Sequence, residues 1–331
     1  MAGVEEGPVT EGPSLTVGAY LGTWLEHVRT RVRASTYDGY YFLVTNHAVP
    51  ALGHLPLGEL HPLHVQRLYA RMLSPAYGGS RGPLSAKTVG NLHRVLRQAM
   101  AQAVAWRLMS WNPASAAQPP RSRGAEPAVI DRDLALRLLA AAAGSRFELP
   151  VALAVATGMR RGEILGLRWS DQDDGWEVAR VVRSLQATRS GLAFEEPKTR
   201  RSRRAVGLPA FLHPYLQRQR ISQGLRRDGP GQPPAGVGLV VDSGDGSPWN
   251  PDNFSRGWPE FLRARSLPHV RFHDLRHAHA TFMLLQGVHP KVVSERLGHA
   301  SVGITLDTYS HVLPTMQSEA VAAFDRLFAS A

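Results

Sequence analysis

A proline-rich segment in the first half of the chain limits what this sequence can fold into. Residues 112–130 read NPASAAQPPRSRGAEPAVI, with four prolines among small and charged residues. Such a segment cannot continue a helix or build a core, because proline removes a backbone donor and the other side chains are too small or too polar. At 331 residues the chain is also too long for one compact core. We therefore predict two domains joined by a linker over residues 113–130.

The residues before this linker have the spacing of helices and show no convincing strand. Apolar side chains recur every three or four residues, which is the period of a helix that buries one face. The pattern predicts a small helical bundle over residues 15–112, after a disordered lead-in over residues 1–14. The expected helices are residues 15–32, a stretch capped by Ser35-Thr36 that runs to about His47, one that follows Pro62, and one from Ser85 to about Leu108.

The residues after the linker change from helix to strand and back. Asp131 can cap a first helix, and an apolar helix over residues 149–156 ends at Thr157-Gly158. We therefore predict a mainly α chain with a small antiparallel β-sheet, in which residues 131–331 form an α+β domain. The expected strands are residues 176–184, 191–195 and 203–208, and the later helices are residues 209–223, 251–264, 273–286, 290–297, a short piece ending near Val312 and a tail from about Thr315.

Composition and charge narrow the class of protein. The chain has no cysteine, which excludes disulfides, thiolate catalysis and cysteine-type zinc sites. No apolar run approaches the roughly 20 residues that cross a bilayer, and the acidic N-terminus does not resemble a signal peptide. We therefore expect a cytoplasmic, nucleoid-associated protein with no membrane partner. A net charge of +11 favours binding to a polyanion such as nucleic acid. An arginine-rich composition that follows from a GC-rich genome would give the same charge.

Two basic segments are candidates for phosphate contacts. In ATGMRRGE, residues 156–163, Arg160 opens a helix after a glycine turn, where free backbone N–H groups favour anions. In EPKTRRSRR, residues 196–204, a basic turn between two strands could push Lys198 into a DNA groove. Taken alone, each segment is more often a solvated surface run.

A histidine-rich segment, FHDLRHAHATF, covers residues 272–282. His273 and Arg276 are three residues apart, so they share one face of a helix. His273 and His277 are four apart, which is also the spacing of two zinc ligands on a helix. That zinc motif needs glutamate directly after the first histidine, and here Asp274 stands in its place. With no obvious third ligand, we expect no metal.

The segment RLGHASVGITLDTYSHV, residues 296–312, allows two interpretations. Tyr309 lies ten residues after His299 on a short polar stretch, where it could act as a nucleophile. Residues 291–305 also resemble a helix-turn-helix with Gly298 at the turn, which would give DNA binding without catalysis.

Together these residues resemble the tyrosine recombinase, or phage integrase, family of the lambda-integrase type. Arg160, Lys198, His273-x-x-Arg276, Gly298-His299 and Tyr309 occur in the order of the family signature, which covers most of the chain. The resemblance implies an N-terminal helical, SAM-like core-binding domain and a tyrosine-recombinase catalytic domain. Since the helical domain begins near Leu15, the two-domain architecture is closer to Xer-like recombinases than to phage integrases with an extra arm-binding domain.

The resemblance implies a site-specific recombinase that cleaves and rejoins DNA through a 3′-phosphotyrosine, without a cofactor. Tyr309 would attack the scissile phosphate, while Arg160 and Arg276 would bracket its non-bridging oxygens. The remaining expected roles are a phosphate hydrogen bond from His299, protonation of the leaving 5′-oxygen by Lys198, general-base assistance by His273, and orientation of an arginine by Glu163.

The implied partners are double-stranded DNA and further copies of the chain, with four protomers acting on two duplexes through a Holliday junction. The sequence does not decide whether accessory proteins that bend DNA or set the direction of recombination are needed. A type IB topoisomerase, which uses the same chemistry as a monomer, and a non-catalytic DNA-binding protein are the alternatives. Arg161 competes with Arg160 as the first arginine, but Arg160 directly follows the Thr-Gly-x turn. The further residues expected to contact DNA are Arg121, Arg123, Arg161, Arg200, Arg201, Arg203, Lys87 and Arg94.

Overall fold

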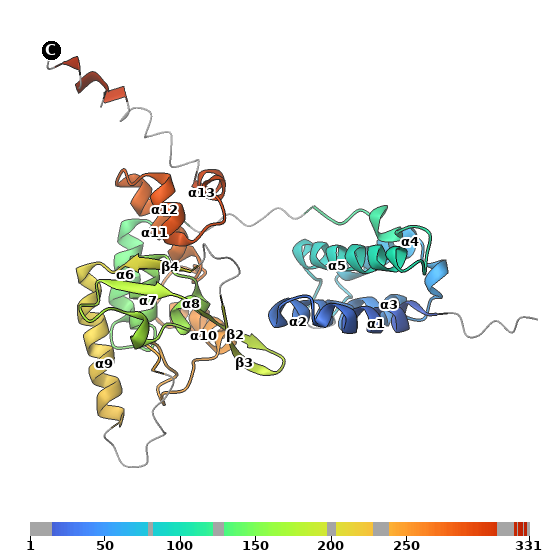
Figure 1. Ribbon diagram of the computed structural model, residues 1–331, viewed down its shortest axis with the longest axis horizontal. Helices are drawn as coiled ribbons and strands as arrows, with labels where there is room; N and C mark the ends of the chain where they lie inside the picture. The colour runs from blue at the N-terminus through green and yellow to red at the C-terminus, as the bar shows by residue number, and fades with distance from the viewer. Residues whose placement is uncertain are drawn as a thin grey trace, which may run out of the picture. The chain divides into compact units, whose positions relative to one another are not determined.

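The structure is a computed structural model that describes residues 15–78, 82–121, 129–196, 203–227, 238–309, 321–322, 324–326 and 328–329. The chain divides into two compact units, residues 1–125 and residues 126–331, which are described separately below (Figure 1). In the part of the chain that the structure describes, no helix has the length and apolar character needed to span a membrane.

The first unit is a helical bundle closed around one apolar core. Thr16 caps its first helix and Ser85 caps its longest, each accepting a hydrogen bond from a backbone N–H three residues later. Trp24 stacks on Tyr40 across the bundle, with ring centroids 5.7 Å apart. The elements are α1 (Val17–Arg29), α2 (Ala34–Leu43), the π-helical η1 (Val44–Ala48), α3 (Val49–Leu52), η2 (Leu57–Glu59), α4 (Pro62–Leu73), α5 (Ala86–Ala105) and η4 (Pro113–Ser115).

Two expectations for this unit need correction. The second helix begins at Ala34 with Arg33 as its N-cap, so Ser35 and Thr36 lie inside its first turn and do not cap it. The predicted linker also begins too early. Ala114 and Ala117 are buried in the core of the bundle, and the backbone N–H of Gln118 donates to Gln66 Oε1 at 3.0 Å. The small alanines between the prolines fit against the helices, which extends this unit beyond residue 112.

The second unit is organised around α7 (Glu148–Thr157), which is buried along most of its length. Nearby, Phe147 packs edge-on and tilted against Trp249, Phe254, Trp258 and Phe261, with ring centroids 5.0–5.5 Å apart. Asp131 caps α6 as predicted. The other helices are α6 (Arg132–Ala142), α8 (Arg161–Leu165), η5 (Trp169–Asp171), η7 (Ala210–Leu212), α9 (His213–Arg227), α10 (Pro251–Ala264), α11 (Asp274–Leu285), α12 (Pro290–Leu297) and α13 (Val302–Tyr309).

The strands differ from the prediction of one small sheet. The segment expected to be one strand over residues 176–184 is divided into β1 (Val178–Val181) and β2 (Ser184–Thr188). Within the described residues, β1 pairs antiparallel with β4 (Arg204–Gly207), and β2 pairs antiparallel with β3 (Gly191–Glu195), as two separate sheets. The break lets β2 pack on α8, where a Cβ on Gly162 would lie 2.7 Å from the carbonyl oxygen of Leu185. The fold class, mainly α with small antiparallel sheets, is confirmed.

Near the C-terminus, the described part of residues 321–328 is helical. Phe324 and Phe328 are exposed there, with ring centroids 4.9 Å apart. The expected start of the tail helix at about Thr315, and the expected end of the preceding helix near Val312, lie outside the described residues.

Candidate active site

The turn between α7 and α8 can accommodate only glycine at position 158. Gly158 ends α7 with φ 64°, in the left-handed region that disfavours other residues. A Cβ here would also lie 2.5 Å from the Leu297 side chain and 2.7 Å from the His279 ring. The glycine therefore lets α7 approach α11 and α12 closely, and it brings Arg160 to the start of α8.

Arg160 and Arg204 share one carboxylate. The backbone N–H of Arg160 donates to Glu163 Oε2 and its Nη1 donates to Oε1, both at 2.9 Å. Arg204 Nη2 donates to Glu163 Oε2, also at 2.9 Å. The side chains of Glu163 and Arg204 are buried, whereas that of Arg160 is 41% exposed. Glu163 therefore fixes Arg160 from below and leaves part of its guanidinium open to a ligand.

Burial alone would raise the pKa of the Glu163 carboxyl. The hydrogen bond and charge of Arg204, together with the charge of Arg160, outweigh burial and lower this pKa to about 2. The carboxylate is therefore ionised at neutral pH. Arg204 was not among the predicted site residues, although it shares an inward face of β4 with buried Val206, and that alternation was readable in the sequence.

Arg276 is buried, 3% exposed, between the ends of two helices. Its Nη1 donates to the carbonyl oxygen of Gly158 at 2.7 Å, and its Nη2 donates to that of Leu297 at 2.8 Å. Carbonyls at helix C-termini lack helical partners and carry negative charge, which makes them good acceptors for a cation. Burial, together with the charge of Arg160, lowers the pKa of Arg276 to about 9, so the group is still protonated at neutral pH.

His273 and His299 lie near these arginines and are both neutral at pH 7. His273 precedes α11 at the surface, yet desolvation by its neighbours and the charges of His277, Arg276 and Arg160 lower its pKa to about 4. Burial, with the charges of Arg276 and Arg160, lowers the pKa of His299 to about 4 as well. His299 Nδ1 lies 2.8 Å from Oγ1 of Thr305, a buried residue of α13.

Tyr309 is the last residue of α13 and is 2% exposed. Its hydroxyl lies 2.9 Å from His277 Nδ1. Burial raises the pKa of Tyr309 to about 12, although the charge of Arg276 opposes the rise. Its ring packs in a small apolar cluster formed by α11 and α12, whose buried members are Ala280, Leu284, Val293 and Leu297.

The sequence suggests His277 only as the second histidine of a zinc site. Positions 277 and 309 are 32 residues apart, and no local pattern links them. Across the described ranges, His273 makes no hydrogen bond to Tyr309; its ring instead meets the His277 ring edge-on, with centroids 5.2 Å apart. No group of three or more His, Cys, Asp or Glu side chains in the described residues is arranged to hold a metal ion.

The residues expected to contact DNA fall into three groups. Lys198, Arg123, Arg200 and Arg201 lie outside the described residues. Arg161 is half-buried and directs Nη1 to the Pro251 carbonyl oxygen at 3.0 Å and to Ser255 Oγ, so it is engaged within its own domain. The exposed members are Arg121 near the end of the helical unit, Lys87 and Arg94 on α5, and Arg203, which pairs with Glu196.

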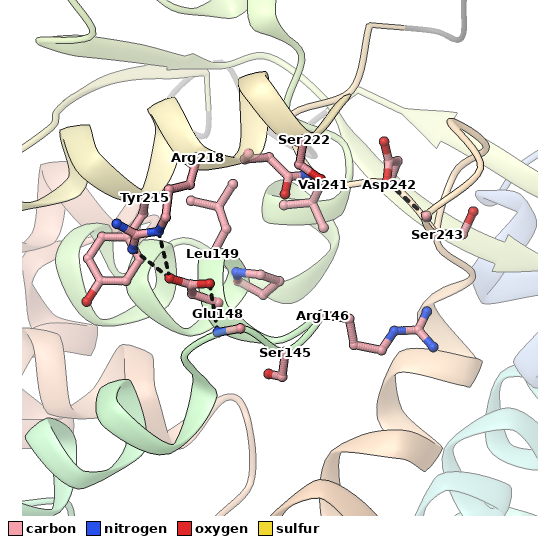
Figure 2. Close-up of a pocket in the computed structure, with 14 residues that line it drawn as sticks. Ser145, Arg146, Glu148, Leu149, Tyr215, Arg218, Ser222, Val241, Asp242 and Ser243 are labelled. Atoms are coloured by element: carbon pink, nitrogen blue, oxygen red, sulfur yellow. Dashed lines mark hydrogen bonds and ion pairs between the residues drawn. The ribbon is translucent and has the colours of Figure 1, made fainter. Parts of the chain in front are cut away.

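A hollow of about 400 Å³ lies in the second unit between the start of α7, α9 and the loop around Asp242 (Figure 2). Its charges are largely satisfied by one another. Arg218 Nη2 donates to Glu148 Oε1 at 2.6 Å, and Glu148 Oε2 accepts from the backbone N–H of Gly144 at 3.0 Å. Of the described residues that line this hollow, none is among the predicted catalytic residues.

Comparison with known proteins matches both units. Residues 129–316 match the model described as the phage integrase family, and residues 16–73 match that described as the phage integrase N-terminal SAM-like domain. A XerC-like tyrosine recombinase of Caldanaerobacter subterraneus is 27% identical over 348 residues, which cover 98% of this chain and 87% of that protein. Tyrosine recombinase XerC of Mycobacterium bovis is 30% identical over 251 residues, covering 71% of this chain and 74% of that protein.

Solved structures of integrases share the fold. The Tn1549 transposon integrase in complex with a circular intermediate DNA gives a TM-score of 0.75 at 20% identity, covering 89% of this chain and 95% of that one. A lambda integrase tetramer bound to a Holliday junction gives a TM-score of 0.67 at 19% identity, covering 93% and 82%.

Proposed function

This chain belongs to the phage integrase family, and we propose that Tyr309 is the nucleophile with which it breaks and rejoins DNA strands. Its family identifies it as a tyrosine recombinase, an enzyme of site-specific DNA recombination. The observation that carries the assignment of Tyr309 is the placement of its hydroxyl. The hydroxyl lies 2.9 Å from Nδ1 of His277. His277 directly follows the buried cation Arg276 in α11.

A tyrosine ester explains how strands are exchanged without a nucleotide cofactor. Attack by the hydroxyl breaks a phosphodiester and forms a phosphotyrosine, so the energy of the broken bond is retained. The 5′-hydroxyl of a partner strand can then attack that ester and restore the DNA backbone. We assign the 3′-phosphate to Tyr309 and the free 5′-hydroxyl to the leaving strand.

We place the scissile phosphate between Arg160 and Arg276. Arg276 is pre-oriented by two helix-end carbonyls, and Arg160 by Glu163, so neither guanidinium needs to reorganise as charge builds on the non-bridging oxygens. Guanidinium pairs of this kind bind phosphate by charge-assisted, bidentate hydrogen bonds. His299 adds a further donor, and Lys198 supplies the proton for the leaving 5′-oxygen.

We propose an assembly of four protomers that exchanges strands between two duplexes through a Holliday junction. A lambda integrase tetramer on such a junction has the same fold, which supports the proposal. Exposed Lys87, Arg94 and Arg121 would neutralise backbone phosphates of the duplex. The enzyme would act on chromosomal DNA in the nucleoid, with accessory proteins that bend DNA or set direction as further partners.

A nicked suicide substrate, from which the short 5′ fragment diffuses away, tests the nucleophile. The wild type should accumulate a covalent protein–DNA complex, and Tyr309→Phe should form none while its DNA binding persists. The matched control is Tyr215→Phe, a tyrosine on α9 outside the site, which should form the complex at the wild-type rate. Adduct formation by Tyr309→Phe would overturn the assignment.

Chelation and product analysis test the alternatives. Cleavage should survive EDTA, because two guanidinium groups replace a metal at the phosphate. Recombinants between two paired sites identify a recombinase, whereas relaxation of supercoils alone would identify a topoisomerase. Sequence-specific binding with no adduct from any variant would identify a DNA-binding protein.

A further inference from the structure

The Tyr309 hydroxyl is held by α11, the helix that also carries Arg276. The Tyr309 ring lies in the cluster with Ala280 and Leu284, which follow His277 by three and seven residues and therefore share its face of the helix. The ring thus packs along the second and third turns, while the hydroxyl lies 2.9 Å from Nδ1 of His277. Nδ1 of His277 is therefore the nitrogen placed to exchange a proton with the hydroxyl.

The surroundings keep the His277 ring neutral and able to accept a proton. Burial lowers the pKa of His277 below its ordinary value of 6.5, the charges of Arg276 and Arg271 lower it further, and Asp274 opposes them. The other titratable groups that face the ring are His273, His299 and Tyr309. Of these, His273 and His299 are neutral at pH 7, so the fixed charges around His277 are those of Arg271, Asp274 and Arg276.

His273, the general base that the family resemblance implies, is one ring further from the nucleophile. Its ring contacts the edge of His277 and is exposed at the surface, where it precedes α11. His273 is therefore open to solvent, whereas His277 contacts the tyrosine hydroxyl.

We propose that His277 is the general base of strand cleavage, taking the Tyr309 proton onto Nδ1. This inference rests on the proposed role of Tyr309 as the nucleophile. As the Oη–H bond breaks, the Oη electron pair forms the bond to phosphorus and the bond from phosphorus to the 5′-oxygen breaks. The leaving oxygen takes a proton from the donor on its own side of the phosphate. On rejoining, the 5′-hydroxyl attacks, the phosphotyrosine bond breaks, and Nδ1 returns its proton to Tyr309.

The proposed step requires one tautomer of His277 in the resting enzyme. To accept from the hydroxyl, Nδ1 must be unprotonated, so the ring proton lies on Nε2. After proton transfer, the positively charged imidazolium would be next to the negatively charged phosphotyrosine. Protonation of the base is thereby coupled to formation of the ester.

The test compares single-turnover cleavage of the suicide substrate by full-length variants over a range of pH. Asparagine places an amide atom near the position of Nδ1 and can hold the hydroxyl, but it cannot take a proton. We expect His277→Asn to cleave about 10²-fold more slowly, within the range for general-base catalysis. The wild-type rate should fall at low pH as His277 becomes protonated. In the variant this fall should vanish, and the rate should keep rising with pH as Tyr309 ionises unaided.

Parallel variants separate the outcomes. His269→Asn, at an exposed histidine before α11, is the matched control and should keep the wild-type profile. His277→Gly with added imidazole should regain cleavage in proportion to the imidazole concentration, and this readout stands even if the asparagine variant folds poorly. DNA binding by each variant, measured by mobility shift, establishes that the fold is intact.

Each contrary result has its own meaning. If His277→Asn keeps the wild-type rate and pH profile, His277 is not the general base. Its role would then be limited to positioning the Tyr309 hydroxyl by a hydrogen bond. Loss of the low-pH fall in His273→Asn instead would assign the base to His273. Both results leave the proposed function intact, because neither bears on whether Tyr309 carries the covalent complex, which Tyr309→Phe tests.

Discussion

The same side-chain pair, a histidine bonded to a tyrosine hydroxyl, occurs in both units of the molecule. In the helical unit, His47 Nδ1 lies 2.9 Å from the Tyr77 hydroxyl, and His93 Nδ1 lies 3.0 Å from that of Tyr69. In the catalytic domain, His277 meets Tyr309 at 2.9 Å. The geometry of the hydrogen bond is therefore no guide to function by itself.

What differs is the charge beside each tyrosine. In the helical unit, burial raises the pKa of Tyr69 with no charged neighbour opposing it, and burial raises that of Tyr77 against the single charge of Arg71. Burial raises that of Tyr309 too, but the Arg276 charge acts against it, and Arg276 also interacts with Arg160, Glu163 and Arg204. The Tyr69 pair joins α4 to α5 and the Tyr77 pair joins η1 to the turn after α4. The catalytic pair instead lies beside a group of several cations that are already oriented by carbonyl and carboxylate oxygens. The group of cations therefore distinguishes a candidate nucleophile from a packing contact.

The largest expected effect on the cleavage rate comes from replacing the guanidinium group of Arg276. Arg276→Lys keeps a charge but cannot bond Gly158, Leu297 and a phosphate together. We expect single-turnover cleavage to fall by about 10²–10³, as for loss of one donor to a transition-state oxyanion. DNA affinity should change little, because most binding comes from backbone contacts elsewhere. Wild-type cleavage by this variant would show that the cations do not distinguish the two kinds of pair.

A smaller effect is expected from Glu163, which orients Arg160 without meeting the phosphate. Its folded-state pKa of about 2 lies below its ordinary value of 4.5. A lowered pKa stabilises the fold above pH 4.5, and this contribution disappears as pH falls from 4.5 towards 2. Chemical denaturation should show that Glu163→Gln lacks this pH-dependent part, which is on the order of a few kcal/mol. An unchanged pH dependence would contradict the ion pairs with Arg160 and Arg204.

The smallest effect tests the other side of the comparison. Tyr69→Phe removes the hydroxyl that bonds His93 between α4 and α5. We expect the free energy of unfolding of the helical unit to drop by about 1 kcal/mol, the usual net contribution of one hydrogen bond. Covalent complex formation on the suicide substrate should be unaffected. A strong loss of cleavage would mean that the helical pair contributes to more than packing.

Local signals predicted much of the fold. Ser85, Asp131 and Gly158 act as the caps that their residue types favour, and Pro62 opens α4. The division of residues 176–184 into two strands was missed, because it depends on packing of β2 against α8. The linker was drawn too long, because burial of Ala114 and Ala117 depends on the surface that the bundle offers.

The candidate site could likewise be predicted only where local sequence signals exist. The arginines and His273 belong to short segments with their own signature, whereas the contact of His277 with Tyr309 and that of Arg204 with Glu163 join positions 32 and 41 residues apart. Contacts at such separations arise only when α11, α13 and β4 have packed. The proposed role of His277 is therefore one that the structure suggests and the sequence pattern does not.

The most direct test of Tyr309 as the nucleophile is to find the residue that carries the DNA. Wild-type enzyme trapped on the suicide substrate would be digested with protease and nuclease, and the peptide bearing a nucleotide would be sequenced by mass spectrometry. We predict a single modified peptide with the 3′-phosphate on Tyr309. A nucleotide on any other residue, or a trapped complex in which Tyr309 is unmodified, would contradict the account.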